Sequence, residues 1–515
     1  MWGWRSSRTW AIGIAAGLLV VCSVLPLAHM MVMALGAEGS PGQASWKVLI
    51  LDARQRLLLW NTTLLGVGTA ITATLIGAPI GVLLARSDVP YKAAWRLLLT
   101  VPLVLPPYIV ALAWVSLGGR STFTYSLPAA VAVLSAVLFP LSMLATEAAV
   151  RSVDGRFEEA ALLVSGPSHV LRRITLPLAA PGIWAAALII FVLAISEFGV
   201  AALLRVRVFT TEVFTAFSAL YDFRRALVLT IPLLVLSALV AIVAAALLGD
   251  RLVTTRRGLA STPGVRFKRA APTLLALAAV ASLTFVLPLL VLLGEAFGGR
   301  SSLSLLRGSQ GVIINSLLFA ALAAFVAVAI AFWLGYARAR AGGRLGRSMD
   351  ALLLALFAIP STITGIALIG MWNQRGLPGA LYGTHAMLLL ASLARFLPIA
   401  ALVLGATLRQ VPASHEEAAA VSGAGWLRTM AHIIVPQTWH GVLAAWTVTF
   451  ILAFGELGAS ILVAPPGETT LPIRIYTLIA NSPSSDVAML ALLQAGVVIC
   501  PLVVLAFALR TREAA

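Results

Sequence analysis

The sequence predicts an all-α polytopic membrane protein with about twelve transmembrane helices, arranged as two parallel six-helix repeats. Three observations support this prediction. Of the 515 residues, 60% are hydrophobic and only 11% are charged, whereas a soluble domain averages about 25% charged residues. Apolar stretches of about 20 residues, the length that crosses a bilayer, recur along the whole chain. Short motifs also recur in the same order in both halves.

Twelve apolar segments are long enough to cross the hydrocarbon core. Each is expected to be a helix, because an open strand would leave backbone groups without hydrogen bonds in lipid. The first follows Arg5 and Arg8 and is longer than the apolar region of a signal peptide, so we interpret it as a retained helix. The predicted spans are residues 11–35, 58–85, 94–117, 127–150, 181–204, 226–249, 273–294, 311–336, 349–372, 385–408, 440–463 and 486–509.

The distribution of lysine and arginine predicts that both termini are cytoplasmic. Of 36 such residues, 23 fall in segments that this orientation makes cytoplasmic, 12 fall in outer segments, and Arg395 lies within a span. The net charge of +17 is therefore interpreted as a consequence of topology. We expect membrane lipid as a partner and no nucleic acid.

Each half holds an even number of spans, so the halves share one orientation about an axis along the membrane normal. The predicted domains are an N-terminal half at 1–249, a basic cytoplasmic linker at 250–270 and a C-terminal half at 271–515. Two motif pairs show the repeat most clearly: Glu158-Glu159-Ala160-Ala161 with Glu416-Glu417-Ala418-Ala419, and Glu197-Phe198-Gly199 with Glu456-Leu457-Gly458.

Two predicted cytoplasmic loops carry paired carboxylates followed by small residues. They read EEAALLVSGPSHVLRRITLP at 158–177 and EEAAAVSGAGWLRTMAHIIVP at 416–436. Each predicts a short helix, a sharp turn that Gly166 or Gly423 permits, and an amphipathic piece that ends at a proline. A loop lying on lipid headgroups is the alternative, but anionic lipid would repel the carboxylates, and the pattern occurs twice.

These loops resemble the EAA motif in permease subunits of type I ATP-binding-cassette importers. The second loop fits that spacing from Glu417 to Gly423, whereas the first has one residue too many between Glu159 and Gly166, and an ungapped register would start at Glu158. The resemblance extends over nearly the whole chain to the fused permeases of ferric-iron and thiamine importers.

The resemblance implies a permease of the bacterial inner membrane that forms the solute pathway of an ATP-driven, binding-protein-dependent importer. Two cytoplasmic ATPase subunits, which would hold ATP and Mg²⁺, and an external solute-binding protein would be its partners. The chain itself would bind no cofactor or metal and would catalyse no reaction. Ferric iron is the first expected solute and thiamine the second, followed by a polyamine or an oxyanion. The implied ATPase-coupling residues are Glu158, Glu159, Ala160, Ala161, Gly166, Glu416, Glu417, Ala418, Ala419 and Gly423.

Four side chains in or near the spans are candidates for the solute pathway. Glu197 and Glu456 lie at matching places, and a carboxylate there needs a cavity or a partner. They either line the pathway, which would suit a cation, or cap backbone groups or pair with an arginine. Arg395 either lines the pathway, snorkels or forms an internal ion pair. Tyr108 follows a proline cluster that can kink the third span near a gate.

Two other classes of protein were considered. A secondary transporter of the major facilitator type also has six plus six spans, but the stretch GYARARAGGRLGR at 335–347 lacks the aspartate of that class's loop motif. A membrane-embedded enzyme would need a catalytic constellation such as an HExxH zinc pair, which the sequence lacks.

Overall fold

The computed structural model describes residues 2–35, 53–119, 121–248, 271–298, 305, 307–467 and 469–510. Within these ranges every secondary-structure element is helical, which confirms the predicted all-α class. The elements up to residue 248 are α1 (Trp2–Leu19), η1 (Val20–Val24), α2 (Leu25–Leu35), α3 (Ala53–Arg86), α4 (Lys92–Val104), α5 (Pro107–Gly118), α6 (Leu127–Arg151), α7 (Gly155–Leu162), α8 (Pro167–Val170), η3 (Leu171–Thr175), α9 (Leu176–Ser196), α10 (Gly199–Leu203), α11 (Phe209–Ser218) and α12 (Phe223–Leu248).

The elements from residue 271 onward follow a similar order, and the η segments in both halves are π-helical turns. They are α13 (Ala271–Ala281), η4 (Ser282–Val286), α14 (Leu287–Gly298), α16 (Gln310–Arg340), α17 (Gly343–Phe357), α18 (Ser361–Trp372), α19 (Leu377–Leu381), α20 (His385–Leu408), α21 (Ser414–Val421), α22 (Trp426–Thr429), η5 (Met430–Ile434), α23 (Val435–Phe454), α24 (Ser460–Val463), α25 (Leu471–Ile479) and α26 (Ser484–Arg510).

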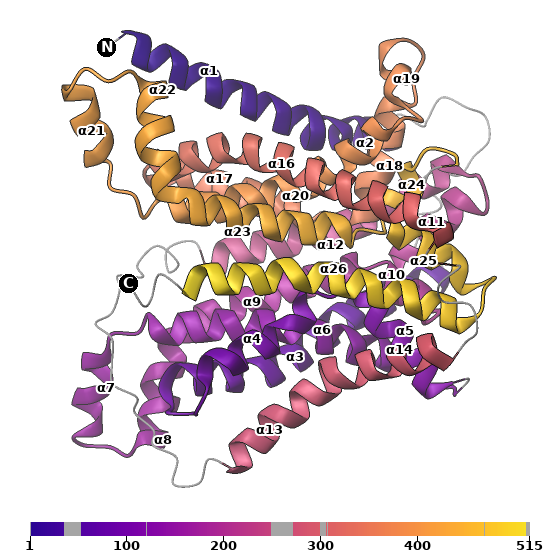
Figure 1. The fold of residues 1–515 in the computed structure, drawn as a ribbon, viewed down its shortest axis with the longest axis horizontal. Helices are drawn as coiled ribbons and strands as arrows, with labels where there is room; N and C mark the ends of the chain where they lie inside the picture. The colour runs from indigo at the N-terminus through magenta and orange to yellow at the C-terminus, as the bar shows by residue number, and fades with distance from the viewer. Residues whose placement is uncertain are drawn as a thin grey trace.

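Nine helical stretches of the described chain are long and apolar enough to cross a membrane, and two bent helix pairs raise the number to eleven. The nine are α1 to α2, α3, α6, α8 to α9, α12, α13 to α14, α16, α20 and α26. The remaining predicted span, 440–463, falls on α23, whose first turns carry the polar residues Gln437 and His440. The helices run roughly side by side along the long axis of the molecule (Figure 1).

Two spans predicted to be continuous, 94–117 and 349–372, are in fact broken. The axis turns by 88° between α4 and α5 and by 90° between α17 and α18. Prolines cause both breaks: the N-cap of α5 is Pro106 and the N-cap of α18 is Pro360, each with an extended ψ. Proline has no N–H for the helix and disfavours a helical residue before it.

Two further predicted spans end earlier than expected, at Ser196 instead of 204 and at Phe454 instead of 463. A short helix follows each end, α10 in the first half and α24 in the second. The chain leaves the spanning helix because the acidic residue that follows, Glu197 or Glu456, binds the first N–H groups of the next helix.

The repeat is visible in the irregularities of the helices as well as in their order. Wide π-helical turns interrupt the first span of each half, as η1 and η4, and the helix after each paired-carboxylate loop, as η3 and η5.

A glycine also lies at the equivalent helix contact in each half. A Cβ on Gly81 of α3 would clash with the Met143 carbonyl of α6, and one on Gly335 of α16 would lie 3.1 Å from the Ala401 carbonyl of α20. Small residues let membrane helices approach this closely.

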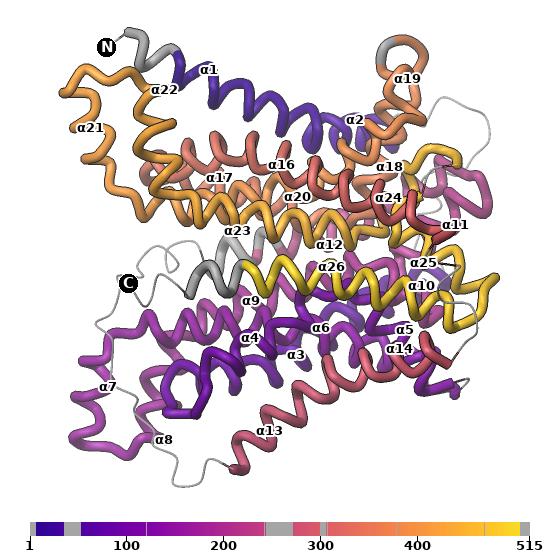
Figure 2. The backbone as a smooth tube through the Cα atoms, in the orientation of Figure 1, coloured from indigo at the N-terminus to yellow at the C-terminus, as the bar shows by residue number. Residues whose placement is uncertain are grey.

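The first helices of the two halves pack across the boundary between them. Helices α1 and α2 lie against α16 and α18, and α13 and α14 lie against α4 and α5. Figure 2 shows this exchange in its colours, with the indigo N-terminal helices over the orange segments and α13 beside the purple ones. The domain boundaries at 249 and 271 stay a prediction, and the linker 250–270 lies outside the described residues.

Candidate functional site

The two paired-carboxylate loops fold alike and lie at one end of the molecule. Each consists of a short helix, α7 or α21, followed by a turn and a second helix, α8 or α22, that runs on into a long helix, α9 or α23. Both loops project from the same end, on the left in Figure 1. The predicted short helices and turns are therefore present, but Pro177 and Pro436 lie within continuous helix and do not end the second piece.

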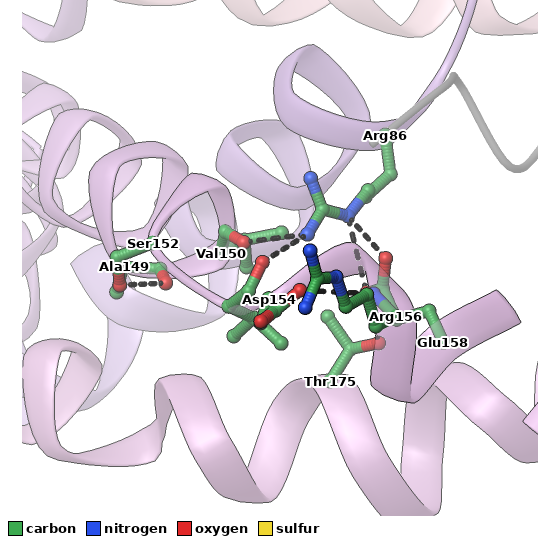
Figure 3. A network of polar contacts seen from close by, with 9 residues as sticks. Arg86, Ala149, Val150, Ser152, Asp154, Arg156, Glu158 and Thr175 are labelled. Carbon is green, nitrogen blue, oxygen red and sulfur yellow. Dashed lines mark hydrogen bonds and ion pairs between the residues drawn. The ribbon is translucent and has the colours of Figure 1, made fainter. Parts of the chain in front are cut away.

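In the first loop, the first carboxylate of the pair is buried and anchors the loop to the bundle. The Nε atom of Arg86, at the end of α3, donates to Glu158 at 3.1 Å, and the hydroxyl of Thr175 donates to it at 2.6 Å. Arg86 also donates through Nη2 to the Val150 carbonyl at 2.8 Å. Figure 3 shows this guanidinium between the end of α6 and the carboxylate on α7.

The second loop has the same clamp at the end of α16. Arg340 donates to Glu416 at 2.7 Å through Nε and to the Val411 carbonyl at 3.0 Å through Nη1. The Tyr336 hydroxyl donates to the second carboxylate oxygen at 2.7 Å. The clamps thus share an arginine, a glutamate and a carbonyl, and differ in the hydroxyl, which comes from Tyr336 in place of Thr175.

The second carboxylate of each pair, Glu159 or Glu417, is exposed, as are Ala160 and Ala418, while Ala419 is buried. The paired glutamates therefore have separate places: one binds the bundle and the other faces outward. Sequence reasoning missed the two arginines. A signal was present, because Arg86 and Arg340 stand at the ends of equivalent spans.

The turn glycines of the two loops are not equivalent. Gly423 has φ +77°, the left-handed conformation that favours glycine. Gly166 has φ −74° and is the N-cap of α8, where its counterpart is Gly425, the N-cap of α22 with φ −69°. Gly166 lies in the predicted turn between α7 and α8, but its φ does not require glycine. The first loop turns with ordinary backbone angles.

Large apolar side chains are exposed at the tips of both loops. Leu163 and Val164 are 87% and 85% exposed, and Val421 is 90% exposed. Exposed apolar groups beside free carboxylates form a surface suited to a protein partner.

The carboxylates of Glu197 and Glu456 cap short helices. Glu197 accepts from the N–H of Gly199 at 3.0 Å, and Glu456 accepts from the N–H groups of Ala459 and Ser460, both at 2.8 Å. Backbone capping, one of the alternatives weighed from the sequence, is present in the structure, and within its described residues neither carboxylate forms an ion pair with an arginine. That the two carboxylates line the pathway stays a prediction.

These two acidic elements meet each other at the junction of the halves. A Cβ on Gly199 would lie 3.4 Å from Leu457, and a Cβ on Gly458 would lie 3.5 Å from Phe198. The repeated motif therefore marks the place where the two halves touch near their shared axis.

Arg395 and Tyr108 surround this junction. Arg395 donates to the carbonyls of Phe357, at 3.4 Å, and Ile359, and so binds the free carbonyls where α17 ends. The buried Tyr108 hydroxyl donates to Gln494 of α26. Their roles as pathway residues stay predictions.

The fold and the paired loops define a membrane-spanning protein built from two repeats, with two similar loops at one end. The chain belongs to the family of binding-protein-dependent transport system inner membrane components, whose model matches residues 77–254 and again 327–512. It is 25% identical to the Fe(3+)-transport system permease protein FbpB 2 of Haemophilus influenzae, over 89% of this chain and 91% of that protein.

Shorter relatives match one half of the chain. The molybdenum transport system permease protein ModB of Escherichia coli K12 is 35% identical over 27% of this chain and 69% of its own length. ModB of Mycobacterium tuberculosis H37Rv is 30% identical over 39% of this chain and 80% of its own length. The protein is therefore the permease of an ATP-binding-cassette importer, a transport subunit of the inner membrane, and the major-facilitator alternative is discarded.

Proposed function

We propose that this permease imports ferric iron, driven by two ATPase subunits that each seat on one paired-carboxylate loop. The observation that carries the proposal is the repeated clamp, in which Arg86 holds Glu158 and Arg340 holds Glu416. Both loops are fixed to the bundle at the same end, and each presents a free carboxylate and apolar tips. This end would be cytoplasmic, and α1 begins there, beside α22.

The helices that leave the loops offer a mechanical route to the junction of the halves. The continuous helix Pro167–Ser196 is about 45 Å long at 1.5 Å per residue. It starts in the first loop and ends one residue before Glu197. The second loop connects in the same way, through η5 and α23, to the segment before Glu456. Movement of the two loops toward each other would therefore tilt both helices and change the contact between the halves.

Ferric iron is proposed as the solute because the relative named for it matches along nearly its whole length and that of this chain. Thiamine is the second candidate. An external binding protein would deliver the solute to the end opposite the loops.

The test uses the permease reconstituted in liposomes with its ATPase subunit and an iron-loaded binding protein. We expect the loaded binding protein to stimulate ATP hydrolysis, and Glu417→Lys or Val421→Asp to reduce ATPase association several-fold. Arg375→Gln, a substitution of an exposed residue outside the loops, is the control. Solute uptake driven by a proton gradient without ATP would overturn the proposal. If only a thiamine-loaded binding protein stimulates ATP hydrolysis, thiamine replaces ferric iron as the proposed solute.

A further inference from the structure

A cavity of about 760 Å³ lies at the end of the molecule opposite the two loops. Its walls come from the start of α3, from α10, from the segment 204–207 and from α11, and the second half contributes Tyr476 of α25. In Figure 1, α10, α11 and α25 gather at the right, far from α7 and α21 at the left. The cavity therefore lies mostly within the first half and meets the second half at Tyr476, at the end of the molecule from which a solute would arrive.

The charged side chains that line this cavity are mostly basic. Arg54, Arg205 and Arg207 line it together with a single carboxylate, that of Glu212. Glu212 is already engaged, because Arg54 lies 2.7 Å and Arg225 3.7 Å from it. Arg207 is exposed, and in the described part of the chain its guanidinium has no ion-pair partner. Among the residues that the structure describes, no carboxylate pairs with Arg207, so this part of the cavity wall carries a positive charge.

The backbone of Arg205 is held in a conformation that normally takes glycine. Its φ is +55°, and the turn closes with a hydrogen bond of 2.8 Å from the Val206 N–H to the Ala201 carbonyl. A side chain in this region is strained, and such strain tends to occur at functional sites. Arg205 is one of the residues that line the cavity, and its guanidinium lies 5.2 Å from the centre of the Tyr125 ring. At the matching sequence position of the second half, Ala464 has an ordinary φ of −59°.

Aromatic rings separate the cavity from the junction of the halves. The Phe198 ring lies 5.8 Å from that of Tyr476 and 4.7 Å from that of Phe214. Phe198 immediately follows Glu197, so the floor of the cavity is the element through which the halves touch. A solute bound against Phe198 would therefore lie next to the contact between the two halves. Tilting of α9 and α23 would change that contact.

We propose that this cavity receives the solute as an oxyanion, bound by the guanidinium groups of Arg205 and Arg207. Guanidinium offers a planar fork of donors that matches carboxylate and phosphate oxygens, whereas a bare metal cation would be repelled. The proposal rests on the import function above, since it treats the cavity as the entry to the pathway. The oxyanion is either the free solute or the ligand of a metal complex. In the second case, iron would enter as a complex with net negative charge.

The test measures binding of three probes to the full-length permease in lipid nanodiscs by titration calorimetry: inorganic phosphate, citrate and ferric citrate. At least one should bind, and Arg207→Gln should weaken it by about tenfold or more, the loss of one charge-assisted hydrogen bond. Arg205→Gly should weaken it similarly while relieving the left-handed strain, so a folding defect cannot explain that loss. Arg375→Gln removes the same charge outside the cavity and should have no effect.

The outcomes separate the two sources and the two proposals. Binding of phosphate or citrate points to a free oxyanion, and binding of ferric citrate alone points to a complex; both support the cavity assignment. The cavity assignment is overturned if none of the three probes binds, or if Arg375→Gln weakens probe binding as much as the cavity variants do. It is also overturned if the Arg205 and Arg207 variants affect only the capture of the binding protein. ATP hydrolysis stimulated by the binding protein is scored separately, so the cavity proposal can fail while the import function stands.

Discussion

The Nε atom of Arg340 lies 2.7 Å from a carboxylate oxygen of Glu416, and 76 residues separate the two in the sequence. The same pair recurs in the other half as Arg86 and Glu158, 72 residues apart. In both cases the arginine ends a spanning helix and the glutamate begins a loop that is the proposed ATPase contact. The clamp therefore makes each loop a rigid extension of the bundle.

Removing the buried carboxylate of the second clamp should loosen its loop. Glu416→Gln leaves Arg340 without its counter-charge in a largely buried site, at a cost of about 2 kcal/mol. Hydrogen exchange of residues 414–429 should speed up accordingly. Glu417→Gln, the exposed neighbour, should change exchange little. Equal effects of the two variants would show that the clamp does not hold the loop.

The hydroxyl donors of the clamps should contribute less than the arginines. Thr175→Val removes one hydrogen bond to Glu158, of 2.6 Å. Tyr336→Phe removes one to Glu416, of 2.7 Å, and also the acceptor of the Trp426 indole N–H, which lies 3.4 Å from the hydroxyl. Each should cost about 1 kcal/mol, measured as faster exchange of the corresponding loop only. An effect of Tyr336→Phe on the first loop would contradict the independence of the clamps.

The loop glycines should respond differently to alanine. Gly423→Ala places a Cβ at φ +77°, which should cost about 1 kcal/mol and weaken ATPase association. Gly166→Ala is the matched control, because its φ of −74° suits alanine and no atom lies within 4 Å of the added Cβ. A defect from Gly166→Ala as large as that from Gly423→Ala would contradict the difference between the two glycines.

Helix contact in the second half should depend on Gly335. A Cβ there would lie 2.8 Å from the Gly405 nitrogen of α20, so Gly335→Ala must push two backbones apart, at about 1–3 kcal/mol. Gly311→Ala, on the same helix with no atom within 4 Å, is the control. The midpoint of thermal unfolding in detergent should fall for the first variant alone. Equal midpoints would mean that the helices separate without cost.

The sequence by itself determined the membrane class, the repeat, the number of spans within one to three, and the two paired-carboxylate loops. These follow from local properties. Hydropathy over about 20 residues determines which segments can span a bilayer, and the order of the motifs can be read directly from the sequence. The predicted position of the loops at one end depends only on counting spans.

Only the tertiary structure decided which glutamate of each pair is buried, that Arg86 and Arg340 hold them, and that Glu197 and Glu456 cap helices at the junction of the halves. It also placed Arg205 and Arg207 in one cavity with Tyr476, from the other half. Each of these depends on contacts between residues far apart in the chain. Hydropathy and spacing do not encode such contacts, because they describe each segment without its neighbours.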